Sequence, residues 1–219
     1  MLSFVVIGLG RFGAAVAMEL YRLGHEVLAI DEDEDRIQRV SDYVTHAMVG
    51  DARDEAVLKS LGVRNFDCGI VAIADDIQAS IMITICLKEL GLKQVVCKAQ
   101  DDMHGKVLEK IGADRVVFPE RDMGKKLAQS LASKNIIDYI ELSREYSIVE
   151  LAAPEVWAEK TLGELNIRAR HGITVLAVRS PDRKHLTLSP HAEHMLHQGD
   201  VLISVGLNKS FDRLRALRD

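Results

Sequence analysis

The first 118 residues alternate short runs of β-branched residues with longer segments of helical periodicity. Strands joined by helices of this length form βαβ units, in which the strands are parallel and the crossovers right-handed. The six predicted strands are Phe4–Ile7, Glu26–Ile30, His46–Val49, Cys68–Ile73, Val95–Lys98 and Arg115–Phe118. The predicted helices between them are Gly13–Leu23, Asp33–Asp42, Glu55–Leu61, Ile77–Leu90 and Met103–Ile111. The alternation predicts an α/β domain over residues 1–119 with a Rossmann-like, doubly wound parallel sheet.

The pattern changes after residue 119. Residues 120–137 have the periodicity of one long amphipathic helix, with an apolar stripe of Met123, Leu127, Leu131 and Ile136. Predicted strands follow at Ser147–Leu151, Ile173–Val178 and Val201–Val205, and a last helix at Lys209–Leu217 carries Phe211, Leu214 and Leu217 on one face. We therefore expect a connector (crossover) helix over 120–138 and a small α+β domain over 139–219.

Composition narrows the class of protein. No apolar stretch approaches the ~18 consecutive residues of a membrane-spanning helix. The formal net charge of −5 argues against a nucleic-acid partner, because domains that bind nucleic acid are usually strongly basic. The N-terminus lacks the pattern of a signal peptide, and Cys68, Cys86 and Cys97 fall within predicted strands or helices. We expect a cytoplasmic protein with buried, reduced thiols.

A glycine-rich motif follows the first predicted strand. Gly8, Gly10 and Gly13 form Gly-x-Gly-x-x-Gly directly before a helix. In such a turn the first glycine permits the tight bend, the second lets phosphate oxygens approach the backbone, and the third lets helix and strand pack closely. Asp31 ends the next strand, where a carboxylate accepts hydrogen bonds from ribose hydroxyls and repels a 2′-phosphate. The motif predicts a nucleotide site that disfavours NADP; the alternative is a tight turn without a ligand.

Other charged residues of this region allow two interpretations. Arg11 lies inside the motif, where its guanidinium either contacts a phosphate or is solvated at the surface. Asp51 follows the third strand, and Asp75 and Asp76 follow the fourth. These carboxylates either face a ligand at the carboxyl edge of the sheet or cap the next helix.

Residues for hydride chemistry are not evident. No His–Asp or Lys–Tyr pair follows the predicted nucleotide domain, so we do not expect an enzyme. His191, His194 and His197 repeat every third residue and are either ligands of a transition metal or part of a solvated polar loop.

Seven short motifs together resemble the RCK (regulator of potassium conductance) family, whose members contain TrkA-N and TrkA-C domains, and most closely its Ktr-type members. The likeness covers essentially the whole chain. It rests on Ile7–Gly13, Gly50–Ala52, Cys97–Ala99, Phe118–Glu120, Leu162–Leu165, Ile167–Gly172 and Gly199–Leu202.

The resemblance implies that the first domain binds ATP, ADP or NAD(H). By motif it assigns the site to Gly8, Gly10, Arg11, Phe12, Gly13, Asp31, Glu32, Asp51, Ala52, Ala74, Lys98 and Glu120. In this arrangement Arg11 reaches a neighbouring subunit's γ-phosphate, and Glu120 lies near that phosphate together with Mg²⁺ or Na⁺. A carboxylate beside a triphosphate requires such a cation or an arginine.

The resemblance also implies cyclic di-AMP binding in the second domain, at positions matched by Ile167, Arg168, Thr174 and Pro190. Thr174 departs from the asparagine that is common there. Family members form homodimers that assemble into an octameric ring, which docks on the inner face of the cell membrane. There the ring gates a potassium-translocating subunit of the KtrB or TrkH type in response to nucleotides. The alternative functions are an NAD-dependent oxidoreductase and a free-standing nucleotide or redox sensor.

Overall fold

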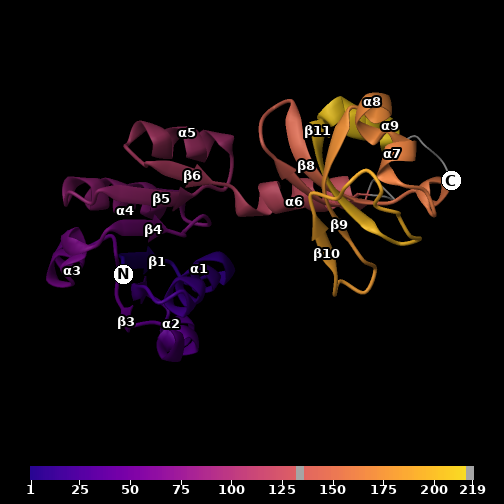
Figure 1. Ribbon diagram of the computed structural model, residues 1–219. Helices are drawn as coiled ribbons and strands as arrows, with labels where there is room; N and C mark the ends of the chain where they lie inside the picture. Colours follow the sequence, from indigo (N-terminus) through magenta and orange to yellow (C-terminus); the bar gives the residue numbers. More distant parts are fainter. Residues whose placement is uncertain (132–135, 216–219) are drawn as a thin grey trace. The chain divides into compact units, whose positions relative to one another are not determined.

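The computed structural model describes residues 1–131 and 136–215, and the chain divides into two compact units, Met1–Glu120 and Arg121–Asp219 (Figure 1). Each unit has its own sheet and its own hydrophobic core. Within the described residues, no helix is both long enough and apolar enough to cross a bilayer.

The first unit contains the predicted six-stranded parallel sheet. Its strands are β1 (Ser3–Ile7), β2 (Glu26–Asp31), β3 (His46–Val49), β4 (Cys68–Val71), β5 (Gln94–Lys98) and β6 (Arg115–Val117). Their spatial order is β3-β2-β1-β4-β5-β6, and every neighbouring pair is parallel. The order reverses direction at β1 and β4, as in a doubly wound sheet. The predicted Rossmann-like fold class is confirmed.

Helices cover both faces of this sheet. They are α1 (Arg11–Arg22), α2 (Glu34–Val40), η1 (Ser41–Tyr43), α3 (Glu55–Ser60), η2 (Val63–Asn65), α4 (Ile77–Glu89) and α5 (Asp102–Lys110). Val6 packs with residues of α1 and α2 in one core cluster, whereas its neighbours Val5 and Ile7 pack with residues of α3, α4 and α5 in another. The alternation of side chains along β1 therefore fills two cores.

Side-chain caps fix where most of these helices begin. Asp33, Asp54, Asp76 and Asp101 each accept a backbone N–H from the first turn of the helix that follows. Helix α1 is different, since it begins after Gly10 and has neither a side-chain cap nor an acidic residue in its first turn. The first N–H groups of an α-helix have no partner within the helix, so this end of α1 is open to an anion.

The second unit is built on a five-stranded antiparallel sheet of order β10-β9-β11-β8-β7. The strands are β7 (Ile136–Glu141), β8 (Tyr146–Ala152), β9 (Ile173–Arg179), β10 (Leu186–Leu188) and β11 (Val201–Leu207). The helices are η3 (Glu155–Trp157), α7 (Leu162–Leu165), α8 (Ile167–His171) and α9 (Asn208–Arg215). Phe211 and Leu214 of α9 are buried in the core with Trp157, as the predicted stripe requires. Leu217, the third residue of that stripe, lies outside the described residues.

The long helix predicted over 120–137 is shorter in the structure. Helix α6 spans Pro119–Leu131, and Ile136–Glu141 is strand β7, with Ile140 paired to Ile148 of β8. The prediction is wrong at this end because Ile136, which the predicted stripe includes, and its neighbour Ile137 are β-branched residues that favour strands, and pairing with β8 stabilises a strand there. Met123, Leu127 and Leu131 are 57–77% exposed in this chain.

Candidate functional site

A cavity of about 360 Å³ opens at the carboxyl ends of the parallel strands of the first unit. It lies where the strand order reverses, which is the usual ligand position in open α/β sheets. Of the twelve residues assigned by resemblance, eleven line it, namely Gly8, Gly10, Arg11, Phe12, Asp31, Glu32, Asp51, Ala52, Ala74, Lys98 and Glu120. The twelfth, Gly13, does not line the cavity and acts in the packing beneath it.

The three glycines of the turn have different geometric roles. Gly8 has φ +90°, and a Cβ there would lie 2.7 Å from Cγ1 of Ile73. A Cβ on Gly13 would lie 1.9 Å from the carbonyl oxygen of Gly8, so helix α1 and the turn touch at this point. A Cβ on Gly10 would meet nothing within 4 Å. The open space at Gly10 adjoins the uncapped N-terminus of α1, which is where a phosphate is expected to bind.

Asp31 is buried at the end of β2 with 6% of its surface exposed. Its Oδ2 accepts the backbone N–H of Leu9 at 2.5 Å, and its Oδ1 accepts the N–H of Asp33 at 2.9 Å. Nη1 of Arg36 lies 3.5 Å from Oδ2. The carboxylate thus joins the glycine turn to the loop after β2. Because each carboxylate oxygen has two lone pairs, acceptor capacity remains for ribose hydroxyls.

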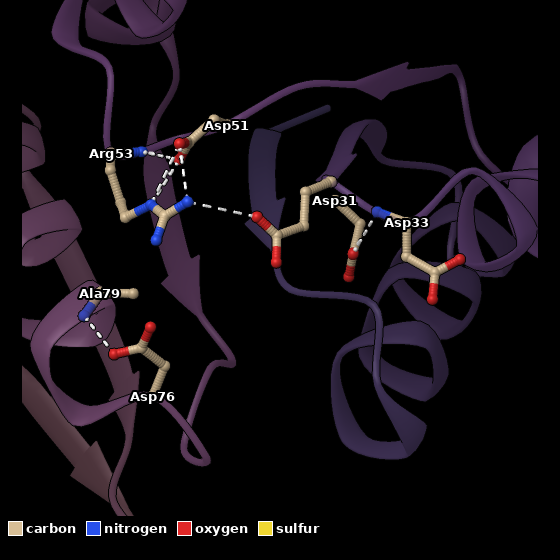
Figure 2. Close-up of polar contacts among 7 residues, drawn as sticks. Asp31, Asp33, Asp51, Arg53, Asp76 and Ala79 are labelled. Carbon is tan, nitrogen blue, oxygen red and sulfur yellow. Dashed lines mark hydrogen bonds and ion pairs between the residues drawn. The ribbon is translucent and has the colours of Figure 1, made fainter.

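Asp51 pairs with Arg53, a residue that sequence reasoning missed. Nε of Arg53 lies 2.8 Å from Oδ1 and Nη2 lies 2.8 Å from Oδ2 of Asp51, and Nη2 is also 3.4 Å from Oε2 of Glu32 (Figure 2). The hydrogen bonds from Arg53 hold the pKa of Asp51 below its ordinary value. Asp54 caps α3, and Asp51 lines the cavity.

The fourth strand is followed by Asp75 and Asp76, and both line the cavity. Asp76 also caps α4, accepting the N–H of Ala79 at 2.9 Å (Figure 2). For Asp76 both interpretations of the sequence therefore hold.

Lys98, the last residue of β5, and Glu120 form an ion pair that lines the same cavity. Nζ of Lys98 donates to Oε1 of Glu120 at 2.6 Å and lies 5.9 Å from the centre of the Phe12 ring. The hydrogen bond from Lys98 is the main cause that lowers the pKa of Glu120, and Arg11 adds a smaller effect. Arg11 is exposed and lines the same cavity. The cations Arg11 and Lys98 thus line the same cavity as the open end of α1 and the carboxylates after β2, β3 and β4.

Arg36 and Arg53 are the charged lining residues that no sequence pattern pointed to. Each stands two or three residues after an acidic residue, in the loop or first turn that follows a strand: Arg36 pairs with Asp33 at 3.3 Å and Arg53 with Asp51. The available signal was an arginine two or three residues after an acidic residue that follows a strand. This spacing is also common on solvated surfaces, so it does not distinguish a residue of a binding site from a surface residue.

The second unit has a hollow of about 180 Å³. Ile167, Arg168 and Thr174 line it, with five further residues, Leu162, Gly163, Asn166, Ile173 and Val175. Pro190 does not line it. The structure therefore brings together three of the four residues assigned to effector binding.

The histidines of the second unit lie in different surroundings. His171 packs against Trp157 with ring centres 5.3 Å apart, and Nδ1 of His197 lies 3.2 Å from Oε1 of Glu159. Over residues 1–131 and 136–215, no three His, Cys, Asp or Glu side chains are grouped so that they could hold a metal ion. Cys68, Cys86 and Cys97 are buried and unpaired, as predicted.

Comparison with known proteins agrees with both units. Residues 4–119 match the TrkA-N domain and residues 146–218 match the TrkA-C domain. Ktr system potassium uptake protein C of Bacillus subtilis is 50% identical over 204 residues, which are 93% of this chain and 91% of that protein. Protein A of the same system is 48% identical, over 96% and 94% of the two chains. The Vibrio alginolyticus protein A is 36% identical, over 98% and 97%.

Solved structures show the same architecture. The GsuK channel superimposes over 98% of this chain with a TM-score of 0.68 at 22% identity, and the GsuK channel bound to NAD over the whole chain with a TM-score of 0.54 at 26% identity. This chain spans about two fifths of the GsuK chain, 39% in each case. The chain therefore belongs to the family of potassium-transport regulators built from a TrkA-N and a TrkA-C domain, together with the Ktr system potassium uptake proteins.

Proposed function

We propose that this protein is the nucleotide-binding regulatory subunit of a potassium uptake system. The observation that carries the proposal is the cavity at the carboxyl edge of the parallel sheet, which unites eleven residues expected to bind a nucleotide. Two relatives that are 48–50% identical over 93–96% of this chain are potassium uptake proteins.

The ligand is an adenine nucleotide, either ATP or ADP, or NAD(H). The cavity has Arg11, Lys98 and the open N-terminus of α1, which favour phosphates. The buried Asp31, hydrogen-bonded to the glycine turn at Leu9, favours ribose hydroxyls. The GsuK channel, 26% identical to this chain, has been solved with NAD.

Glu120 connects the site to helix α6, of which it is the second residue. A phosphate that reaches Lys98 competes with Glu120 for the ammonium group, because both are anions. Mg²⁺ or Na⁺ bound by Glu120 offsets the repulsion between this carboxylate and a terminal phosphate. Nucleotide exchange then changes whether Lys98 remains paired with Glu120 in the first turn of α6. Each nucleotide can shift the assembly between two conformations only by the difference in its affinity for them.

The working form is a homodimer that assembles into an octameric ring on the cytoplasmic face of the membrane, docked on a potassium-translocating subunit of the KtrB or TrkH type. The exposed apolar side chains of Met123, Leu127 and Leu131 support a crossover role for α6, since such a stripe is stabilised by packing against a partner. The hollow at Ile167, Arg168 and Thr174 supports cyclic di-AMP as a second effector.

Four measurements test the proposal. Protein purified without added nucleotide is denatured, and the released ligand is identified by mass spectrometry; calorimetry then compares ATP, ADP and NADH. Absence of binding by all three at micromolar concentration refutes a nucleotide-gated regulator. Co-purification with a potassium-translocating membrane subunit distinguishes it from a free-standing sensor, and turnover of NADH with a small metabolite would instead identify an oxidoreductase.

A further inference from the structure

Arg53 bridges two loops at the carboxylate-rich end of the cavity. Its guanidinium contacts both oxygens of Asp51 at 2.8–3.1 Å and Oε2 of Glu32 at 3.4 Å. Glu32 follows β2 and Asp51 follows β3, so the bridge joins the loops of two neighbouring strands. Because two carboxylates already surround this one guanidinium, Arg53 is not a free counter-ion for a ligand phosphate.

The strand order indicates which part of a nucleotide reaches this bridge. The phosphate site is at the end of β1, the ribose partner Asp31 is at the end of β2, and Asp51 follows β3, the next strand outward. Neighbouring strands are about 4.8 Å apart, so two steps from β1 cover roughly 10 Å, about the reach from phosphate to base. The base of a bound nucleotide therefore falls beside Asp51.

We infer that Arg53 is a positioning residue that sets the base selectivity of this site, by holding the Asp51 carboxylate where it accepts a hydrogen bond from the 6-amino group of adenine. The inference rests on the proposed nucleotide-binding function and adds which group of the ligand is recognised, the 6-amino group of adenine. It concerns a residue that acts through Asp51 and does not itself need to touch the nucleotide.

The chemistry follows from the protonation state of Asp51. An ionised carboxylate accepts hydrogen bonds and donates none, so it pairs with an amino group and repels a carbonyl oxygen. Asp51 is ionised near neutral pH, and hydrogen bonds from Arg53 lower its pKa further. The same two-pronged contact fixes the rotation of the carboxylate, which a single-point contact would leave free. A base with an oxygen at position 6 is then repelled by a carboxylate whose rotation is fixed.

Calorimetry with ADP and IDP tests the inference, because the two ligands differ in the group at position 6 and the proton on N1. We expect the wild-type chain to bind ADP at least tenfold more tightly than IDP. In Arg53→Ala the ratio falls about tenfold, mainly through weaker ADP binding. Arg53→Lys keeps the charge and loses the two-pronged geometry, so its ratio is intermediate. The matched control is Arg22→Ala, which removes an exposed arginine–glutamate pair on α1 outside the cavity and keeps the wild-type ratio.

A general loss of structure would weaken the binding of ADP and IDP alike. The ratio of their affinities changes only if recognition of the group at position 6 changes. A wild-type ratio in Arg53→Ala, or equal binding of ADP and IDP by the wild-type chain, overturns the inference. If Arg53→Ala does not give a native circular dichroism spectrum, Arg53→Lys decides, and a wild-type ratio there overturns it as well. If the wild-type chain binds neither ADP nor IDP, ATP is compared with ITP in the same way, and absence of binding by ADP, ATP and NADH together refutes the proposed function instead.

Discussion

Substitution of two glycines in the same turn separates ligand binding from folding. A Cβ on Gly10 enters open space, whereas a Cβ on Gly13 would lie 1.9 Å from the carbonyl oxygen of Gly8. Gly10→Ala therefore leaves the packing intact and changes only the residue before the first turn of α1. Its cost to the free energy of unfolding is up to about 1 kcal/mol, the usual difference between good and poor residues at that position.

The effect of Gly10→Ala on binding is much larger. The added methyl group occupies the space in which phosphate oxygens approach the N–H groups of α1. Charge-assisted hydrogen bonds of this kind contribute about 1.5–3 kcal/mol each, so loss of two weakens binding by at least about 3 kcal/mol, roughly 100-fold in Kd. Gly13→Ala forces helix and turn apart, and overpacking of this kind costs about 1–3 kcal/mol or more of stability.

Titration calorimetry with ADP and urea denaturation followed by circular dichroism measure the two effects. The only tryptophan, Trp157, lies in the second unit, so its fluorescence reports that unit and serves as an internal control for damage confined to the first. The reasoning is refuted if folded Gly10→Ala binds ADP as tightly as the wild-type chain. It is equally refuted if Gly13→Ala is as stable as Gly10→Ala.

Three further predictions concern buried or paired ionisable groups. Asp31→Asn leaves a single acceptor oxygen for the N–H groups of Leu9 and Asp33. We expect the free energy of unfolding, measured by urea denaturation, to fall by about 1–3 kcal/mol. An unchanged midpoint of the urea transition would contradict the role given to these two hydrogen bonds. Burial raises the pKa of the Cys97 thiol from about 9 to about 11, so between these values the folded chain keeps a proton that the unfolded chain loses. The contribution of this thiol to stability is complete below pH 9, and roughly 2–3 kcal/mol of it is lost in urea denaturation as the pH rises to 11. This loss should be smaller in Cys97→Ala. Glu120→Gln removes an ion pair whose carboxylate is 72% exposed, so the free energy of unfolding changes by less than about 1 kcal/mol. The dependence of ATP binding on Mg²⁺, measured by calorimetry, becomes weaker. An unaltered Mg²⁺ dependence would exclude Glu120 as the cation site.

The first unit could be predicted closely from sequence because its local signals agree with each other. β-branched runs, helix periods and the Gly8–Gly13 motif all indicate one parallel sheet, and the predicted strands are found in the structure with small shifts at their ends. The edge strands of the second unit were harder. β10 has only three residues, Leu186–Leu188, all exposed, so no burial pattern marks it. Segment 136–141 is a strand because it pairs with β8, and the local periodicity that predicted a helix contains no information about that pairing.

The candidate site shows a similar division. Residues in a motif, such as Gly10 and Asp31, could be assigned because their roles follow from backbone geometry at fixed places in the fold. Arg53 could not, since its importance depends on Glu32, 21 residues away and brought near only when β2 pairs with β3. The structure therefore adds the charge pairs that link loops, which leave no local pattern in the sequence.

The burial of all three cysteines has a practical consequence for studies of motion. Cys68, Cys86 and Cys97 are at most 8% exposed, and burial raises the pKa of each thiol. A maleimide dye added near neutral pH therefore finds few reactive thiolates on the native protein. A single cysteine introduced on the surface of each unit becomes the preferred attachment point without removal of the three natural cysteines. Distances between fluorophores can then follow the two units as nucleotides are exchanged.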